Sequence, residues 1–315
     1  MEIDVKVFVA GASGALGVPF VKELLNHGHH VTAMARSAGG PQRQSGTGVD
    51  FVQVDAFNPE SVNAAIQRSS PDIVVDLLTS LPKNPADLPK AFPQDRKLRL
   101  EGGANLYTAA VVAGVKRYLQ QSSGFYLQPG SGSLATEEDS FPLDVSPDIS
   151  LGCQMLRTLE ERVFSDPRME GVALRYGFFY GPGTWYTQDG GAADLLRQRA
   201  LPLVGAGTAI NSFIHVQDAA VATVAAMHSE PGVYNIVDDD PVSVAEWLPA
   251  FAHFVGAPAP VRMSEEEALS TMGPDAVFYH NRLKGARNDK AKAELSFRPR
   301  RLEWLAAMRS TIQSS

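Results

Sequence analysis

The chain has 315 residues, of which 44% are hydrophobic and 20% are charged, and its formal net charge is −7. This length suffices for one large hydrophobic core or two unequal ones, and the composition is typical of a soluble globular protein. The acidic balance and the lack of a Lys/Arg cluster argue against a nucleic-acid partner.

Three further features bear on where the protein works. The single cysteine, Cys153, excludes an internal disulfide and is typical of a reducing compartment. The first predicted strand begins within five residues of Met1, which leaves no room for a signal or transit peptide. The longest apolar runs, such as 108–115, are too short to span a bilayer. We therefore expect a cytoplasmic protein with no membrane partner.

Short apolar runs alternate with helix-length amphipathic segments through the first half of the chain. The expected strands are Val5–Ala10, His30–Ala35, Asp50–Val54, Asp72–Leu78, Arg117–Ser122 and Gly171–Arg175. The expected helices are Ala15–Asn26, Pro59–Gln67, Leu98–Ala113 and Gln154–Phe164. This alternation predicts an α/β fold, a Rossmann-like doubly wound parallel sheet with helices on both faces.

The clean alternation ends after about residue 177. A strand over Phe213–Val216 and a helix over Asp218–His228 are expected to return to the main sheet, and Gly232–Val237 is expected to add one more strand. The remaining predicted helices are Ser243–Val255, Glu265–Met272 and Lys290–Leu295. The second half therefore predicts a smaller, mostly helical lobe.

The turn between the first strand and the first helix carries the clearest functional signal. Glycine occupies positions 11, 14 and 17 directly after the apolar stretch Val7–Ala10. Gly11 allows a tight turn, Gly14 lets the backbone approach a pyrophosphate, and Gly17 lets the helix pack against its strand. The helix N-terminus offers free N–H groups to the anion. The pattern predicts a dinucleotide site, although tight strand-to-helix turns also use glycine for structural reasons alone.

The end of the second strand indicates which dinucleotide is bound. Residues 31–49 contain no Asp or Glu, the residue types that bind the ribose 2′-hydroxyl of NAD. Arg36 can pair with the 2′-phosphate of NADP, and Ser37 adds a hydroxyl; the alternative is a solvated surface arginine. NADP is therefore favoured over NAD. Asp55, which ends the third strand, either accepts a bond from the adenine amino group or caps the helix that begins near Pro59.

Taken together and in this order, the motifs resemble the extended short-chain dehydrogenase/reductase superfamily, specifically its NAD-dependent epimerase/dehydratase branch. The matching stretches are 11–17, 55, 72–79, 105–106, 113–117, 121–123, 174–176, 180–183, 213–218, 232–235 and 286–291. The resemblance implies a Rossmann domain with a small C-terminal substrate lobe. We expect 1–176 to form the NADP-binding domain, with 212–238 returning to it, and 177–211 and 239–315 to form the substrate lobe.

The resemblance also implies the positions of the cofactor contacts. They fall on Gly11, Ser13, Gly14, Ala15, Leu16, Arg36, Asp55, Ala56, Leu77, Leu78, Thr79 and Gln121. The backbone from Tyr176 to Phe179, which includes Phe178, would line the nicotinamide end. A homodimer formed through helices 98–113 and 154–164 is a further implication.

The chain departs from this family at the catalytic position. Redox members use a Tyr-x-x-x-Lys pair, in which the lysine lowers the pKa of the tyrosine and the phenol moves the substrate proton. Here Leu151 stands at the tyrosine position and Met155 at the lysine position. The serine of the preceding strand is retained as Ser122 or Ser123, and Tyr126 is a candidate replacement acid. The usual proton relay is therefore expected to be missing.

Three functions are consistent with the sequence. The first is an NADP-dependent oxidoreductase that reduces a carbonyl or a polarised double bond of a small molecule with a non-standard proton donor. Hydride transfer chiefly needs the cofactor, orientation and an oxyanion stabiliser, so a lost phenol slows the step without forbidding it. The alternatives are a non-redox isomerase, cyclase or dehydratase on the same scaffold, and a catalytically inactive NADP sensor. No metal is predicted. Aromatic residues such as Trp185 and Phe278 argue for a substrate pocket and against the sensor.

Overall fold

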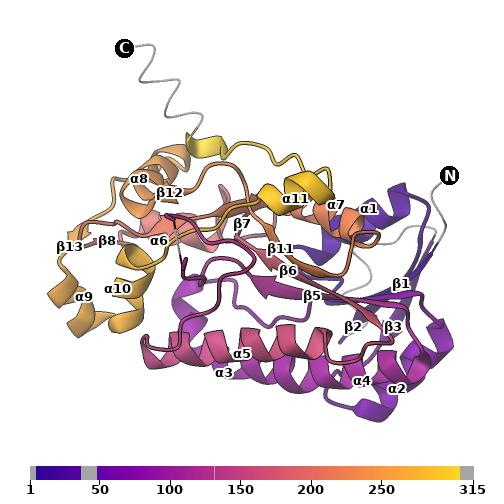
Figure 1. Ribbon diagram of the computed structural model, residues 1–315. Coiled ribbons are helices and arrows are strands. Elements are labelled where there is room, and N and C mark those ends of the chain that lie inside the picture. Colours follow the sequence, from indigo (N-terminus) through magenta and orange to yellow (C-terminus); the bar gives the residue numbers. More distant parts are fainter. Residues whose placement is uncertain (1–4, 37–47, 131, 306–315) are drawn as a thin grey trace.

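A parallel sheet of seven strands lies at the centre of the computed structural model, which describes residues 5–36, 48–130 and 132–305 (Figure 1). In spatial order the strands are β11 (Gly232–Ile236), β6 (Glu170–Tyr176), β5 (Arg117–Ser123), β4 (Ile73–Asp76), β1 (Lys6–Ala10), β2 (His30–Ala35) and β3 (Val49–Gln53). The order reverses between β1 and β4, and α/β sheets bind ligands at the carboxyl ends of the strands at such a point.

Helices cover both faces of this sheet (Figure 1). One face packs against α2 (Pro59–Ser69), α4 (Gly103–Ala113) and α5 (Pro147–Val163), and the other against α1 (Gly17–Asn26), α7 (Val216–Ala226) and α11 (Asp289–Glu294). Side chains alternate along a strand, so Phe8 and Ala10 of β1 enter one core while Val7 and Val9 enter the other. The predicted doubly wound α/β fold is confirmed.

The connection from β4 to α4 contains a helix that the sequence did not predict. A short 3₁₀ turn (Pro85–Asp87) leads into α3 (Leu88–Lys97), and a π-helical turn (Leu98–Gly102) joins α3 to α4. Three prolines at 85, 89 and 93 obscure the helical pattern, because proline usually ends a helix.

The remaining elements form a smaller lobe at one end of the sheet (Figure 1). Its helices are α6 (Gly191–Arg197), α8 (Val244–Phe254), α9 (Glu265–Thr271) and α10 (Pro274–Asn281). Three strand pairs accompany them: β7 (Phe178–Tyr180) with β10 (Phe213–His215), β9 (Ile210–Asn211) with β12 (Val242–Ser243), and β8 (Leu203–Val204) with β13 (Arg262–Met263). The predicted domain boundary at residue 176 stays a prediction.

The expectation that Phe213–Val216 returns to the main sheet was wrong. β10 pairs in parallel with β7, and the N–H of Phe178 donates to the carbonyl oxygen of Ser212 (2.9 Å). The edge of β6 that a returning strand would need is occupied by β11. Within residues 212–238, only β11 and helix α7 go back to the sheet.

The last described segment connects the lobe to the sheet. Arg300 forms a two-pronged ion pair with Asp218 in the first turn of α7 (2.8 and 3.0 Å). The Tyr180 hydroxyl donates to the carbonyl oxygen of Arg301 (3.3 Å). Trp304 is buried, with its ring 4.9 Å from that of Phe251 in α8. This C-terminal segment, residues 300–304, thus contacts both parts of the molecule.

Candidate active site

The glycines of the turn between β1 and α1 differ in what surrounds them. Gly11 has a φ of +84°, and a Cβ there would lie 2.4 Å from the carbonyl oxygen of Leu77. A Cβ on Gly17 would lie 2.2 Å from the carbonyl oxygen of Gly11. A Cβ on Gly14, which is exposed, would meet only that carbonyl oxygen, at 3.2 Å. The protein's own packing therefore requires Gly11 and Gly17, whereas the space above Gly14 is open to a ligand.

The N-terminus of α1 is suited to an anion. In the described part of the chain no side chain caps it, and its first turn holds no acidic residue. Ser13 is exposed, Ala15 is half-buried and Leu16 is buried at this point. Uncapped N–H groups at a helix N-terminus bind phosphate. The residues present fit a dinucleotide pyrophosphate.

Arg36 lies at the carboxyl end of β2, two strands from β4. The residue is exposed, and its carbonyl oxygen accepts a bond from Nε2 of Gln53 on the adjacent strand β3 (3.2 Å). The backbone of Arg36 is thus fixed by the sheet while the side chain projects to solvent. Ser37, its predicted companion, lies outside the described residues.

Asp55 and Ala56 follow β3 at the same edge. Asp55 is exposed and accepts a bond from the N–H of Phe57 (3.0 Å), and Ala56 is buried. Helix α2 is capped by Asn58, whose side chain accepts from the N–H of Ser61 (3.0 Å). The alternative that Asp55 caps this helix is therefore wrong.

The loop after β4 is held by a buried carboxylate. Oδ1 of Asp76 accepts from the N–H of Leu78 (3.0 Å), and Oδ2 accepts from the hydroxyl of Tyr118 (3.0 Å). Leu77 is buried against the glycine turn, whereas Leu78 and Thr79 are half-buried. Sequence reasoning missed Asp76. The signal was available as a carboxylate that ends an otherwise apolar strand.

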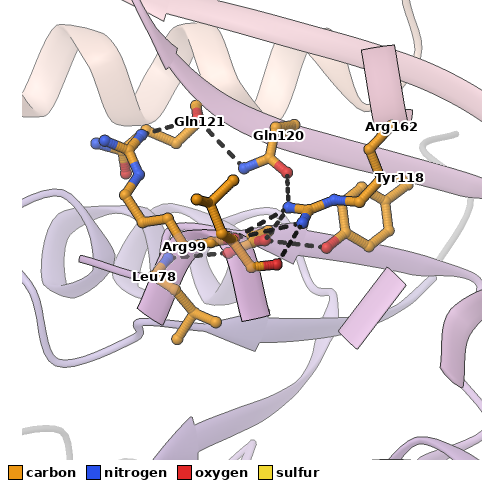
Figure 2. Close-up of polar contacts among 8 residues, drawn as sticks. Leu78, Arg99, Tyr118, Gln120, Gln121 and Arg162 are labelled. Atoms are coloured by element: carbon orange, nitrogen blue, oxygen red, sulfur yellow. Dashed lines mark hydrogen bonds and ion pairs between the residues drawn. The ribbon is translucent and has the colours of Figure 1, made fainter. Parts of the chain in front are cut away.

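Arg162 of α5 completes this buried network (Figure 2). One of its guanidinium nitrogens, Nη2, lies 3.7 Å from Oδ2 of Asp76 and donates to Oε1 of Gln120 (3.0 Å). The other, Nη1, donates to the carbonyl oxygen of Leu100 (3.1 Å). The network ties α5 to the π-helical turn and to the strand ends beneath the candidate site.

The two serines of β5 point to opposite faces of the sheet, because side chains alternate along a strand. The hydroxyl of Ser122 donates to Oε1 of Glu160 on α5 (2.6 Å). Glu160 also accepts two bonds from Arg175 (2.8 Å each). The hydroxyl of Ser123 is buried and has no hydrogen-bond partner within the described ranges. Ser123 is thus the serine that a ligand could engage, on the same face as Gln121.

Tyr126, the candidate replacement acid, is paired with a second tyrosine. Its hydroxyl bonds to the hydroxyl of Tyr279 from α10; Tyr126 is buried and Tyr279 is half-buried. Burial raises the pKa of Tyr126, and burial likewise raises the pKa of Tyr279 well above its ordinary value. A raised pKa means that each phenol holds its proton more tightly, which makes it a weaker acid.

Aromatic rings and helix α5 make up the remaining walls. The ring of Phe125 stacks on that of Phe178, with 4.2 Å between centroids. Tyr176 turns away, because its hydroxyl bonds to Thr223 (2.7 Å), and only its backbone is available at this edge. On α5, Leu151 is exposed and Met155 is buried. The sequence of this helix contains no tyrosine or lysine.

Cys153 has an unreactive thiol. It is buried on α5, and burial raises the pKa of its thiol to about 12. The thiol therefore stays protonated at neutral pH and is a poor nucleophile. Over the described ranges no group of three His, Cys, Asp or Glu side chains is arranged to hold a metal ion. None of the described helices has the length and apolar character needed to cross a membrane.

Comparison with known proteins adds independent findings. Residues 7–237 match the model of the NAD dependent epimerase/dehydratase family. A relative named 3-diazoavenalumate denitrifying reductase, from a Streptomyces species, is 38% identical over 303 residues, which cover 95% of this chain and 97% of the relative.

Solved structures have the same fold. The UDP-glucose 4-epimerase of Thermus thermophilus in complex with NAD is 24% identical, with a TM-score of 0.69 and 94% of each chain covered. The UDP-glucose 4-epimerase of Thermotoga maritima with UDP-glucose is 18% identical, with a TM-score of 0.73; the match covers 98% of this chain and 99% of the epimerase. At these identities the likeness concerns the fold alone.

Proposed function

Because the chain belongs to the NAD-dependent epimerase/dehydratase family, we propose that it is an NADP-dependent reductase that transfers hydride to an electrophilic small molecule. The relative at 38% identity is named a reductase, which favours redox chemistry over the isomerase and sensor alternatives. The open space at Gly14 and the uncapped N-terminus of α1 support a dinucleotide cofactor. When bound, the nicotinamide supplies the hydride.

The proposed substrate class is a diazo or diazonium group on an unsaturated acid. The name of the relative describes removal of nitrogen from a diazo compound. A carbon that bears a diazonium group and accepts a hydride forms a C–H bond, while the C–N bond breaks and N₂ leaves with its electron pair. Charge balances without a proton. A carbonyl, in contrast, needs a proton on oxygen as the hydride arrives.

One observation carries this choice: the two phenols at this end of the sheet are paired with each other and are weakened as acids. Tyr126 and Tyr279 bond to each other, and burial raises the pKa of both. A reaction that needs no proton at the accepting carbon suits such a site. In this proposal Ser123 donates to a polar group of the substrate, and the stacked rings of Phe125 and Phe178 pack against its apolar part.

The test compares two substrates of similar shape, para-diazobenzoate and para-formylbenzoate, with deuterium-labelled NADPH. We expect one N₂ released for each NADPH oxidised, deuterium at the ring carbon that lost nitrogen, and much slower reduction of the aldehyde. A reaction without protein corrects for direct reduction of the diazonium by NADPH. Equal or faster reduction of the aldehyde would overturn the diazo assignment. Conversion of UDP-glucose without net NADPH oxidation would favour the non-redox alternative.

Ser123→Ala is expected to lower kcat/KM for the diazo substrate by about ten- to hundredfold, the usual effect of losing one hydrogen bond to a charged or polarised group. Its melting temperature should stay close to that of the wild type, since no hydrogen bond within the described structure is lost. The matched control is Ser122→Ala, which removes a bond to Glu160. That variant should melt earlier and keep its kcat/KM. The reverse pattern would identify Ser122 as the active serine.

Arg36→Ala is expected to weaken NADPH binding by about ten- to hundredfold and to leave NADH binding unchanged, because a guanidinium–phosphate pair is lost only with NADPH. Fluorescence titration of each reduced cofactor measures both dissociation constants. An unchanged ratio of the two constants would contradict the assignment of NADP over NAD.

We also propose a cytoplasmic homodimer that forms through α4 and α5. Apolar side chains are exposed on or next to these helices, with Val112 66%, Leu151 43% and Phe164 44% exposed. Large exposed apolar side chains are found at protein interfaces. Light scattering coupled to size-exclusion chromatography measures the oligomeric state, and a monomer at micromolar concentration would contradict it.

A further inference from the structure

Arg99 lies at the carboxyl edge of the sheet on an unusual piece of backbone. It belongs to the π-helical turn Leu98–Gly102, and such turns recur at functional sites. Its Nη2 donates to the carbonyl oxygen of Gln121 near the end of β5 (3.2 Å; Figure 2). Only 11% of the side chain is exposed. The sequence predicted an ordinary helix here, so nothing singled out this arginine.

The guanidinium of Arg99 is incompletely paired. Its Nη1 forms an ion pair with Oδ2 of Asp95 at 3.9 Å, a separation too long for a hydrogen bond. The other oxygen of Asp95 accepts from the N–H of Ser80 (2.5 Å). Nε of Arg99 is buried and lacks a hydrogen-bond partner in the described part of the chain. A buried cation with unfilled donors is costly, and an anionic ligand would remove that cost.

The surroundings of Arg99 are those of the candidate substrate site. The residue next to Arg99, Leu100, packs against the hydrophobic cluster that contains Tyr126. Gln121, to which Arg99 bonds, is two residues before Ser123 on β5 and shares its face.

The phosphates of the cofactor are not the natural partner of this cation. The glycine turn follows β1 and Arg36 follows β2, whereas Arg99 bonds to the end of β5. Strand β4 separates β1 from β5. At a strand spacing of about 4.8 Å, the edge at Gln121 is roughly 10 Å from the glycine turn. An anion bound at Arg99 would therefore come from the substrate.

We propose that Arg99 is a specificity-determining residue that binds the carboxylate of an acidic substrate through its planar pair of N–H donors. This assignment rests on the proposed function, in which the substrate is an unsaturated acid. The relative's substrate is likewise named as a carboxylate. Arg99 would hold the carboxylate at β5, so that the reacting carbon lies nearer to the cofactor.

The experiment measures binding and needs no turnover. The probes are para-coumarate and its primary amide, titrated by calorimetry into the protein saturated with NADP. The wild type should bind the acid at least about tenfold more tightly than the amide, as expected for a charge-assisted pair. Arg99→Gln should abolish this preference and leave the amide affinity within about twofold. The control Lys97→Gln removes a cation two positions away that is 56% exposed, and it should change neither affinity.

Equal wild-type affinity for acid and amide would overturn the assignment, and so would an unchanged preference in a folded Arg99→Gln variant. If that variant does not fold, Arg99→Lys decides, because it keeps the charge and loses the planar fork: the acid should bind less tightly and the amide equally well. In turnover, Arg99→Gln should raise KM for the acid and leave kcat nearly unchanged. If the wild type releases no N₂ but distinguishes acid from amide, the proposed function fails while Arg99 remains the carboxylate site.

Discussion

Glu160→Ala is expected to lower the free energy of unfolding by about 3–5 kcal/mol, because it leaves a buried arginine without its counter-charge. Glu160 accepts two bonds from Arg175 and one from Ser122. Arg175 in turn donates to the carbonyl oxygens of Glu137 (3.0 Å) and Asp139 (3.1 Å). The loss should therefore also loosen the loop between β5 and α5. Urea unfolding followed by circular dichroism measures the effect.

The matched control for this prediction is the next residue on the same helix. Glu161 is exposed, and Glu161→Ala should change the free energy of unfolding by no more than about 0.5 kcal/mol. Glu160→Gln keeps the shape and one acceptor oxygen, so its loss should be smaller than that of Glu160→Ala. If Glu160→Ala were as stable as Glu161→Ala, the buried ion pair would have no structural importance.

Gly14→Ala is expected to weaken NADPH binding by about ten- to hundredfold, because the added methyl group would occupy the space that a pyrophosphate needs, and overpacking of this kind costs roughly 1–3 kcal/mol. The fold should be retained, since the methyl group would meet only the carbonyl oxygen of Gly11, at 3.2 Å. Calorimetric titration of NADPH and a thermal melt together separate the loss of ligand binding from the loss of structure.

Gly152→Ala serves as the control for glycine replacement. Gly152 lies within α5, and a Cβ there would meet nothing within 4 Å. An alanine inside a helix should stabilise the protein by about 0.5–1 kcal/mol and leave NADPH affinity unchanged. Undiminished NADPH binding by Gly14→Ala would show that the glycine turn is a structural feature and holds no cofactor.

Much of the sheet could be predicted because its signals are local. Every residue from Val7 to Ala10 is apolar, which marks a strand buried on both faces, and the glycine turn follows it directly. The pairing of β7 with β10 could not be predicted, since it joins segments far apart in sequence and depends on β11 having taken the edge of β6. Helix α3 was not predicted, because the prolines in its sequence are typical of a loop.

In the candidate site, too, local features could be predicted and features that depend on distant residues could not. The glycine turn is contained in seven consecutive residues (11–17), so its spacing is visible in the sequence. The choice between Ser122 and Ser123 depends on Glu160, which follows Ser122 by 38 positions. Tyr126 meets its partner Tyr279 across 153 positions. A single sequence holds no pattern that links such residues, so the tyrosines and serines could be named as candidates but not assigned roles.

The C-terminal segment has a consequence for the order of events during synthesis. Arg301, whose carbonyl oxygen accepts a bond from Tyr180, is synthesised 121 residues after it. The hydrophobic core of the lobe also lacks Trp304 until the C-terminal segment has left the ribosome. The first six strands of the sheet, β1 to β6, are complete by Tyr176, and contacts that are close in sequence form first. A nascent chain therefore contains six of the seven strands of the sheet well before it can close the smaller lobe.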